Sequence, residues 1–137
     1  MRTPGLLALS VALALLSGCK SQEAAPDGPA PPAAPAEIQA LLEERCVECH
    51  SPPKAAAQLS LEGAEGSYAA LVGQPSRQVP TMKIVEPGRP EQSYLLLKLE
   101  GGFEEAGGKG VLMPKKDDAL GPAEVEAIER WIASLGQ

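Results

Sequence analysis

The chain has 137 residues, about the length of one domain. Its formal net charge of −6 argues against nucleic acid as a partner and against recruitment to an anionic membrane surface by basic patches. Aromatic residues make up only 3% of the chain. A core must therefore be aliphatic, or be completed by something other than protein.

Residues 1–18 have the pattern of an export signal: one charge at Arg2, then a short apolar run over residues 6–16. That run is too short to span a bilayer core of about 30 Å, which needs roughly 20 residues. The segment Leu16-Ser17-Gly18-Cys19 resembles the bacterial lipobox, in which the Cys is lipidated and becomes the mature N-terminus. The resemblance implies a signal peptide cleaved after residue 18 and a lipid anchor at Cys19; the alternative is an ordinary secretory signal with an incidental Cys.

The lipobox resemblance also implies a location. A multiply acylated Cys19 anchors a protein stably to a bacterial membrane, facing the periplasm or the cell exterior. In a Gram-negative cell, Lys20 rather than Asp at the second mature position favours the outer membrane by the sorting rule of that family. Residues 19–36 would then be the lipidated Cys followed by a Pro- and Ala-rich tether that reaches up to about 50 Å. The folded domain is expected over residues 37–137.

Within residues 37–137 the apolar spacing predicts an all-α domain with three main helices and long loops. The first helix is expected over residues 37–49. The second is expected to begin at Pro90 and to end at Gly101-Gly102. The third is expected to begin at Pro122 and to end near Gly136. A shorter helical turn is expected over residues 67–72, and the loop over residues 101–121 is long enough to need something that orders it.

The segment Cys46-Val47-Glu48-Cys49-His50 carries the chemistry. Two thiols three residues apart near the end of a helix can reach both vinyl groups of one porphyrin and form thioethers. The imidazole of His50 then lies where it can bind the iron. This spacing is the signature of c-type haem attachment, and the leader exports the chain to a compartment in which such attachment occurs. We therefore predict one covalent haem c, held by Cys46 and Cys49, with His50 as an iron ligand.

Three other interpretations use the same residues. A structural zinc site needs four ligands, and Cys46, Cys49 and His50 would have to be joined by a carboxylate. A thioredoxin-like thiol pair normally opens a helix after a strand, whereas this pair closes a helix. A structural disulfide between Cys46 and Cys49 would close a very small loop and add little to a core. Haem is favoured because it also supplies apolar bulk that the few aromatic residues do not.

The second axial ligand of the iron is expected to be a Met, because His50 is the only His. Met113 is the first choice, since it lies in a long loop and Pro114 stiffens the chain directly after it. Met82 is the runner-up. Each Met could instead fill the core, which is the usual role of this residue, and an open sixth position is the remaining possibility.

Taken together, these motifs resemble those of a small monohaem class I-type cytochrome c. The matching segments are Leu59-Ser60-Leu61, residues 87–95 (PGRPEQSYL), Met113-Pro114 and Trp131-Ile132. The resemblance implies that the first and last helices cross beside the haem, with His50 proximal and Met113 distal. It also suggests that a carbonyl of Pro52 or Pro53 accepts the Nδ1 proton of His50.

The function implied is electron transfer between a redox donor and an acceptor protein, with no enzyme activity of the chain itself. The alternatives are a haem peroxidase or small-gas sensor with an open iron, or a fixed haem subunit of a larger complex. Peroxidase work needs a distal acid-base group, for which only Glu104 and Glu105 are candidates. The partner is expected to meet a ring of basic side chains at the haem edge: Lys54, Lys109, Lys115 and Lys116. The alternative is that these Lys are solubilising loop charges, partly cancelled by Asp117 and Asp118.

Overall fold

The computed structural model describes residues 32–115 and 119–137. The expected signal peptide, Cys19, most of the tether and Lys116 therefore lie outside the described residues. The described part is all-α, as the sequence predicts, with no strand beyond isolated bridges. Its elements are α1 (Ala36–Arg45), the 3₁₀ turn η1 (Ala56–Gln58), α2 (Ala64–Leu71), the 3₁₀ turn η2 (Pro90–Gln92), α3 (Tyr94–Glu100) and α4 (Pro122–Ser134). No helix in these ranges is long and apolar enough to cross a bilayer.

The fold begins slightly before the predicted boundary at residue 37. Ala34, expected in the tether, is buried, and its N–H donates to the carbonyl of Ala64 at 3.1 Å. Pro35 then precedes the first helical residue, Ala36, with an extended backbone. The last residues of the Pro- and Ala-rich segment thus belong to the packed domain.

The first helix is shorter than predicted, because it ends at Arg45 rather than at residue 49. The carbonyl of Leu42 accepts hydrogen bonds from both Cys46 and Val47, at 2.9 and 3.0 Å, so the regular helical ladder ends there. The next turn closes where the N–H of His50 reaches the carbonyl of Cys46 at 2.9 Å. The Cys-x-x-Cys-His segment is therefore a turn that caps α1, not its last helical turn.

The second predicted helix is divided into η2 and α3 by Ser93, which is buried and extended. The Ser93 hydroxyl accepts the N–H of Glu86 at 2.9 Å and donates to the carbonyl of Arg89 at 3.0 Å. These bonds fix the loop before Ser93 and keep Ser93 extended, so the helix is interrupted there. Ser side chains are known to compete in this way with helical hydrogen bonds. The short turn predicted over residues 67–72 is instead part of the eight-residue helix α2.

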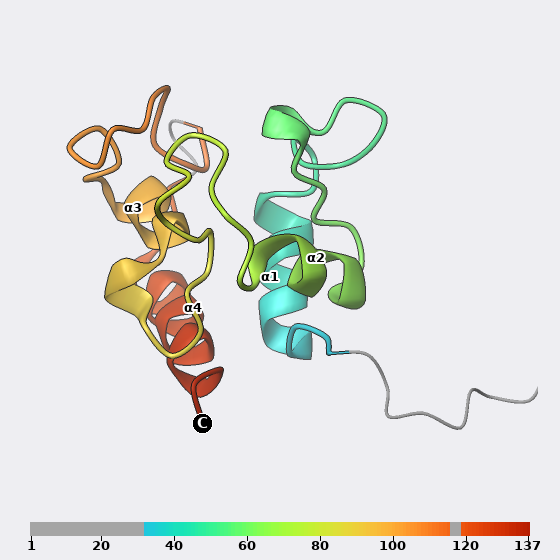
Figure 1. The fold of residues 1–137 in the computed structure, drawn as a ribbon. Helices are drawn as coiled ribbons and strands as arrows, with labels where there is room; N and C mark the ends of the chain where they lie inside the picture. The colour runs from blue at the N-terminus through green and yellow to red at the C-terminus, as the bar shows by residue number, and fades with distance from the viewer. Residues whose placement is uncertain (1–31, 116–118) are drawn as a thin grey trace, which may run out of the picture.

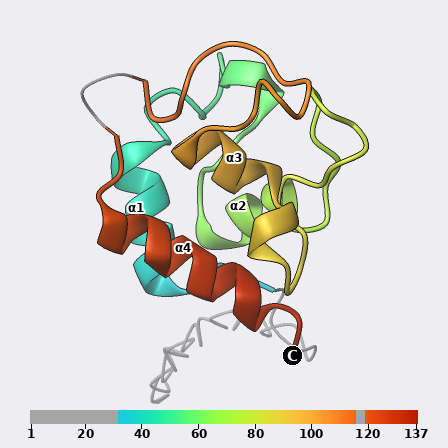
Figure 2. The same ribbon diagram turned by 90° about the vertical axis from the view of Figure 1, so that its left-hand side faces the viewer.

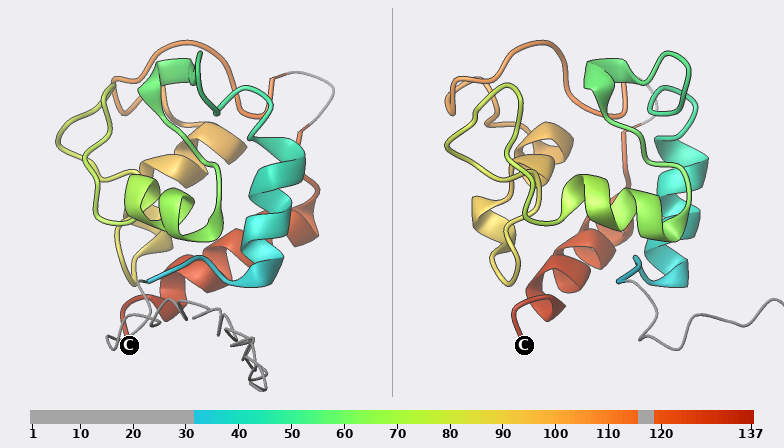
Figure 3. Two further views of the ribbon diagram at one scale, coloured as in Figure 1. Left: turned by 90° about the vertical axis from the view of Figure 1, so that its right-hand side faces the viewer. Right: turned by 45° about the vertical axis from the view of Figure 1, so that its right-hand side comes forward.

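The helices form two halves (Figure 1). In one half lie α1, α2 and η1, and in the other lie α3 and α4. The C-terminal ends of α1 and α3 point toward the same end of the molecule, where loops 46–61 and 101–115 gather (Figures 1 and 3). Helices α1 and α4 pack against each other at an angle, which joins the two halves (Figure 2).

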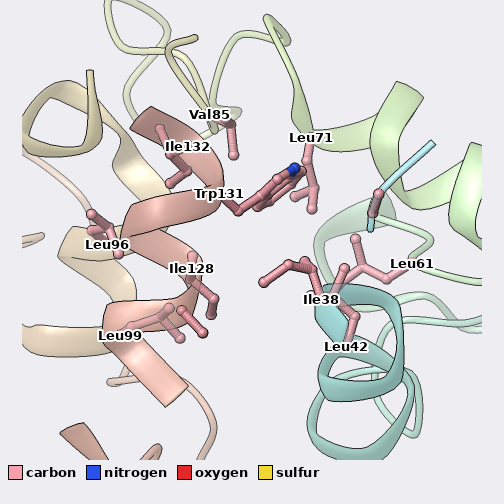
Figure 4. Close-up of a cluster of buried hydrophobic side chains, with 12 residues drawn as sticks. Ile38, Leu42, Leu61, Leu71, Val85, Leu96, Leu99, Ile128, Trp131 and Ile132 are labelled. Atoms are coloured by element: carbon pink, nitrogen blue, oxygen red, sulfur yellow. The ribbon is translucent and has the colours of Figure 1, made fainter. Parts of the chain in front are cut away.

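Packing of α4 provides the centre of the hydrophobic core. This helix begins at Pro122, as predicted, and Glu124 caps its start by accepting the N–H of Gly121 at 2.6 Å. Its buried stripe includes Ile128, Trp131 and Ile132. Figure 4 shows these side chains among apolar residues from α1, α2, α3 and the loops: Ile38, Leu42, Leu61, Leu71, Val85, Leu96 and Leu99. A second, smaller cluster consists of Val79, Tyr94 and Phe103, with Met82 and Leu97 packed against it.

The C-terminal end of α4 is fixed by a close contact between two glycines. The N–H of Gly88 donates to the carbonyl of Ile132 at 2.9 Å. A Cβ placed on Gly88 would lie 2.8 Å from the Cα of Gly136, closer than real Cβ atoms come to backbone. Gly88 also has a φ of +76°, which an L side chain rarely adopts.

Gly88→Ala will therefore lower the free energy of unfolding by about 2 kcal/mol or more, from left-handed strain and a forced shift of the backbone. The matched control is Gly66→Ala, inside α2, where a Cβ meets nothing within 4 Å and φ is not positive. That change will stabilise the protein by about 0.5–1 kcal/mol. Urea unfolding followed by far-UV circular dichroism measures both, and equal effects of the two substitutions would contradict the close packing at Gly88.

Candidate functional site

A cavity of about 810 Å³ lies between the two halves of the molecule. This volume is within the ~300–1,000 Å³ that small-molecule and cofactor sites occupy. Four of the residues that the sequence singles out line it: Cys46, Cys49, His50 and Met113. The structure thus brings together a segment at the end of α1 and a Met that follows it by more than sixty residues.

The two thiols differ in their surroundings and are not joined by a disulfide. Cys46 is partly buried against the core, and Cys49 is exposed. Burial raises the pKa of Cys46 to about 11; the Arg45 guanidinium acts in the opposite direction, and Cys49 raises it slightly further. Cys46 is therefore a thiol at neutral pH, unlike the low-pKa thiolates of catalytic Cys-x-x-Cys pairs.

The His50 ring is oriented by a carbonyl. Its Nδ1 lies 3.3 Å from the carbonyl oxygen of Leu59, so the prediction that Pro52 or Pro53 supplies this acceptor is wrong. A carbonyl can only accept, so Nδ1 carries the proton and Nε2 keeps a lone pair for a metal. A second bond, from the N–H of Leu61 to the carbonyl of His50 at 2.8 Å, fixes the two segments side by side. Leu59 belongs to the Leu59-Ser60-Leu61 segment that the sequence singles out. The sequence alone does not show that a carbonyl of this segment accepts a hydrogen bond from His50.

The two candidate Met residues lie in different environments. Met113 lines the cavity and is partly buried against the main core, and its N–H donates to the carbonyl of Lys98 at 2.7 Å. Met82 packs against the smaller cluster and is not among the residues that line the cavity. The placement of the two residues favours Met113 as the partner of His50.

The walls of the cavity are largely apolar, with leucines from both halves of the molecule. Next to this wall lies a buried donor, the indole N–H of Trp131, which has no acceptor among the described residues. Figure 4 shows the nitrogen end of the ring directed toward Leu71, one of the lining residues. Buried donors in proteins are nearly always paired, so this N–H indicates that an acceptor is missing close to the cavity.

Charged side chains around the cavity are mostly basic, although the whole chain has a net charge of −6. Of the predicted basic ring, Lys54 and Lys115 line the cavity, Lys109 does not, and Lys116 is not described. Among the described residues only Glu48 adds a lining carboxylate. The full basic set is Arg45, Lys54, Arg77, Lys98 and Lys115. The sequence gives no periodic signal for Arg45, Arg77 or Lys98, which reach the cavity from three separate segments.

Other polar groups near the cavity are tied to loops. The hydroxyl of Tyr94 donates to Oε1 of Gln78 at 2.6 Å, and burial raises the pKa of this Tyr. Glu104 and Glu105 are exposed and do not line the cavity, so the structure does not place the expected acid-base candidates at the site. In the part of the chain that the structure describes, no group of three or more His, Cys, Asp or Glu side chains is arranged to hold a metal ion.

Comparison with protein-family models, with curated proteins and with solved structures gave no match for this chain.

Proposed function

We propose that the chain is a monohaem c-type cytochrome that transfers electrons, with haem bound covalently in this cavity. The observation that carries the proposal is that one apolar cavity of about 810 Å³ is lined by both thiols of the Cys-x-x-Cys-His segment, by His50 and by Met113. Cys46 and Cys49 would form the thioethers, His50 would be the proximal ligand and Met113 the distal one. The packing of α1 on α4 beside the cavity is compatible with a cytochrome c-like fold.

Several features of the chain fit haem. The donor set of one imidazole and one thioether is a known pair of axial ligands, and Nε2 of His50 is the nitrogen left available for iron. Burial raises the pKa of Cys46, which disfavours a thiolate ligand to a metal ion such as zinc. The two carboxylates of haem match the basic excess around the cavity, and the buried N–H of Trp131 has no acceptor among the described residues.

Electron transfer is favoured over peroxidase or gas-sensor chemistry by the residues at the site. When bound, haem supplies a single iron that changes between the ferric and ferrous states. His50 and Met113 would supply both protein ligands of the iron, a pair that raises the reduction potential in electron-transfer cytochromes. Met113 lines the cavity, whereas Glu104 and Glu105 are exposed and do not line it. The chain itself then performs no substrate chemistry, and its partners are a redox donor and an acceptor.

The expected location follows from the leader and completes the proposal. Residues 1–18 would be removed on export, and lipid on Cys19 would tether the domain to a bacterial membrane, the outer one in a Gram-negative cell. Maturation outside the cytoplasm is consistent with the thioether chemistry assigned to Cys46 and Cys49.

Covalent haem attachment tests the proposal directly. Expressed with a c-type maturation system, the full chain will gain the mass of one haem and keep its colour on a denaturing gel. Cys46→Ser combined with Cys49→Ser will abolish both signals, because Ser cannot form the thioethers. Cys19→Ala is the matched control and will keep the haem; a chain that gains no haem in any form would overturn the assignment.

Met113→Ala will leave the haem covalently bound but change the ferric iron toward high spin, lower the reduction potential and allow the ferrous form to bind carbon monoxide. Met82→Ala is the control, since Met82 packs away from the cavity. Optical spectroscopy and redox titration measure both variants. If Met82→Ala gives these changes and Met113→Ala does not, the distal ligand is Met82.

Cys19→Ala will release the protein from the membrane fraction without altering its haem spectrum, because anchor and cavity are in separate parts of the chain. Fractionation followed by immunoblotting and visible spectroscopy measures the two properties together. Membrane retention of this variant after its leader has been removed would reject lipidation at Cys19.

A further inference from the structure

Lys98, in the last turn of α3, holds the segment that presents Met113 by three separate contacts. Its ammonium Nζ donates to the carbonyl of Val111 at 2.6 Å and to the carbonyl of Lys109 at 3.3 Å. Its own carbonyl accepts the N–H of Met113 at 2.7 Å. Its ammonium also lies 3.7 Å from the centre of the Phe103 ring. One side chain and its backbone therefore contact residues 109, 111 and 113.

The spacing of these contacts explains how one residue holds the whole segment. The carbonyls of Lys109 and Val111 and the N–H of Met113 are all directed at Lys98, so every second residue of the segment is tied to α3. The carbonyl of Lys98 is one of the last four of its helix, which have no partner within the helix. The N–H of Met113 satisfies it, and a cation in the last turn is favourable to the helix dipole.

Side-chain packing contributes little to holding this segment. Val111 and Leu112, directly before Met113, are 50% and 36% exposed. Gly107 and Gly110 have a positive φ. Glycine restricts the backbone less than other residues do, so these positions do not stiffen the segment. The N–H of Lys109 also donates to Oε1 of Gln78, a loop residue, at 2.9 Å. The contacts of Lys98 are thus the principal link between the Met113 segment and a helix.

Lys98 is itself confined. It lines the same cavity as Met113 and is only partly exposed. Burial lowers the pKa of its ammonium, and the nearby carboxylate of Glu104 acts in the opposite direction. The carbonyls of Lys109 and Val111 and the Phe103 ring replace part of the water that the ammonium loses on burial. These three contacts fix the position of the ammonium.

We propose that Lys98 is the positioning residue for the distal ligand, holding the backbone of residues 109–113 so that the thioether of Met113 is presented into the cavity. This inference rests on the proposed function, in which Met113 binds the haem iron. The basic side chain then acts through the loop, without touching the iron. Loss of the ammonium frees the segment between Gly107 and Met113 and increases the fraction of molecules whose iron has an open position.

The test compares Lys98→Leu with Lys98→Arg and with the control Lys83→Leu in the full haem-loaded chain. Leu removes the donor without introducing a new sulfur ligand. Arg keeps a cation that can reach the carbonyls. Lys83 makes a surface ion pair with Glu86 at 2.9 Å and does not line the cavity, so its replacement removes a Lys of the same size elsewhere.

Three measurements follow the distal ligand: the weak red absorption band of ferric iron bound by Met sulfur, the affinity of the ferrous form for carbon monoxide, and the reduction potential. In Lys98→Leu we expect the red band to disappear at a lower urea concentration than the helical circular dichroism. We expect about tenfold tighter carbon monoxide binding, because charge-assisted bonds to the loop are lost and the open fraction rises in proportion. The potential will fall, Lys98→Arg will restore all three, and Lys83→Leu will match the unmodified protein.

Hydrogen exchange of the peptide that contains Met113 gives a readout independent of iron, and the Lys98→Leu variant will lose protection there while α4 keeps it. If Lys98→Leu does not fold, Lys98→Gln is measured in the same way and decides the result. A red band that is present in the unmodified protein and lost in Met113→Ala, but unchanged in the folded Lys98 variants, overturns the role of Lys98 alone. Failure to take up haem, or an unmodified protein without that band, overturns instead the proposed ligation on which the inference rests.

Discussion

Helix α1 packs against α4, and this contact holds the two halves of the molecule together. It buries Ile38 and Leu42 together with Ile128 and Trp131 and joins the two halves of a chain that is poor in aromatic residues. The contact keeps the two halves together, and the cavity lies between them where no residue of α4 lines it. Arg45 strengthens the junction at the end of α1, where its guanidinium lies 3.9 Å from Glu124 and 3.4 Å from the carbonyl of Ala119.

Backbone carbonyls near this cavity position the two side chains proposed as iron ligands. The carbonyl of Leu59 orients the ring of His50, and the carbonyl of Lys98 holds the N–H of Met113. Carbonyls suit this role because the main chain loses little further conformational freedom once the neighbouring elements are packed. Ligand geometry is thereby linked to the packing of the apolar residues Leu61 and Leu99, which are buried in the same core cluster. Substitutions in the core should therefore shift the positions of His50 and Met113 even without direct contact.

Local patterns in the sequence were sufficient to predict the helical class and the start of α4. Pro122 and the stripe of Val125, Ile128 and Ile132 locate that helix because its signals lie within a few turns of chain. The start at Pro90 and the stop of α3 before Gly101 were also predicted, whereas the end of α1 and the break at Ser93 were not. α1 ends at Arg45 because Leu42 shares its carbonyl between two donors, and Ser93 divides η2 from α3 because its hydroxyl bonds to a loop. In both cases hydrogen bonds that the apolar spacing does not report decided the boundary.

The candidate donors can be read from the sequence: two thiols, one imidazole and a small choice of Met residues, in a chain whose first 18 residues have the pattern of an export signal. The packing of the chain shows which Met lines the same cavity as His50, which carbonyl orients the imidazole, and which basic side chains line the cavity. Those relations join residues far apart in the chain, such as Lys98 with Met113 and Arg45 with Ala119. They depend on how the two halves pack around α4, and a pattern that repeats every three or four residues carries no information about the partner of a residue on another element.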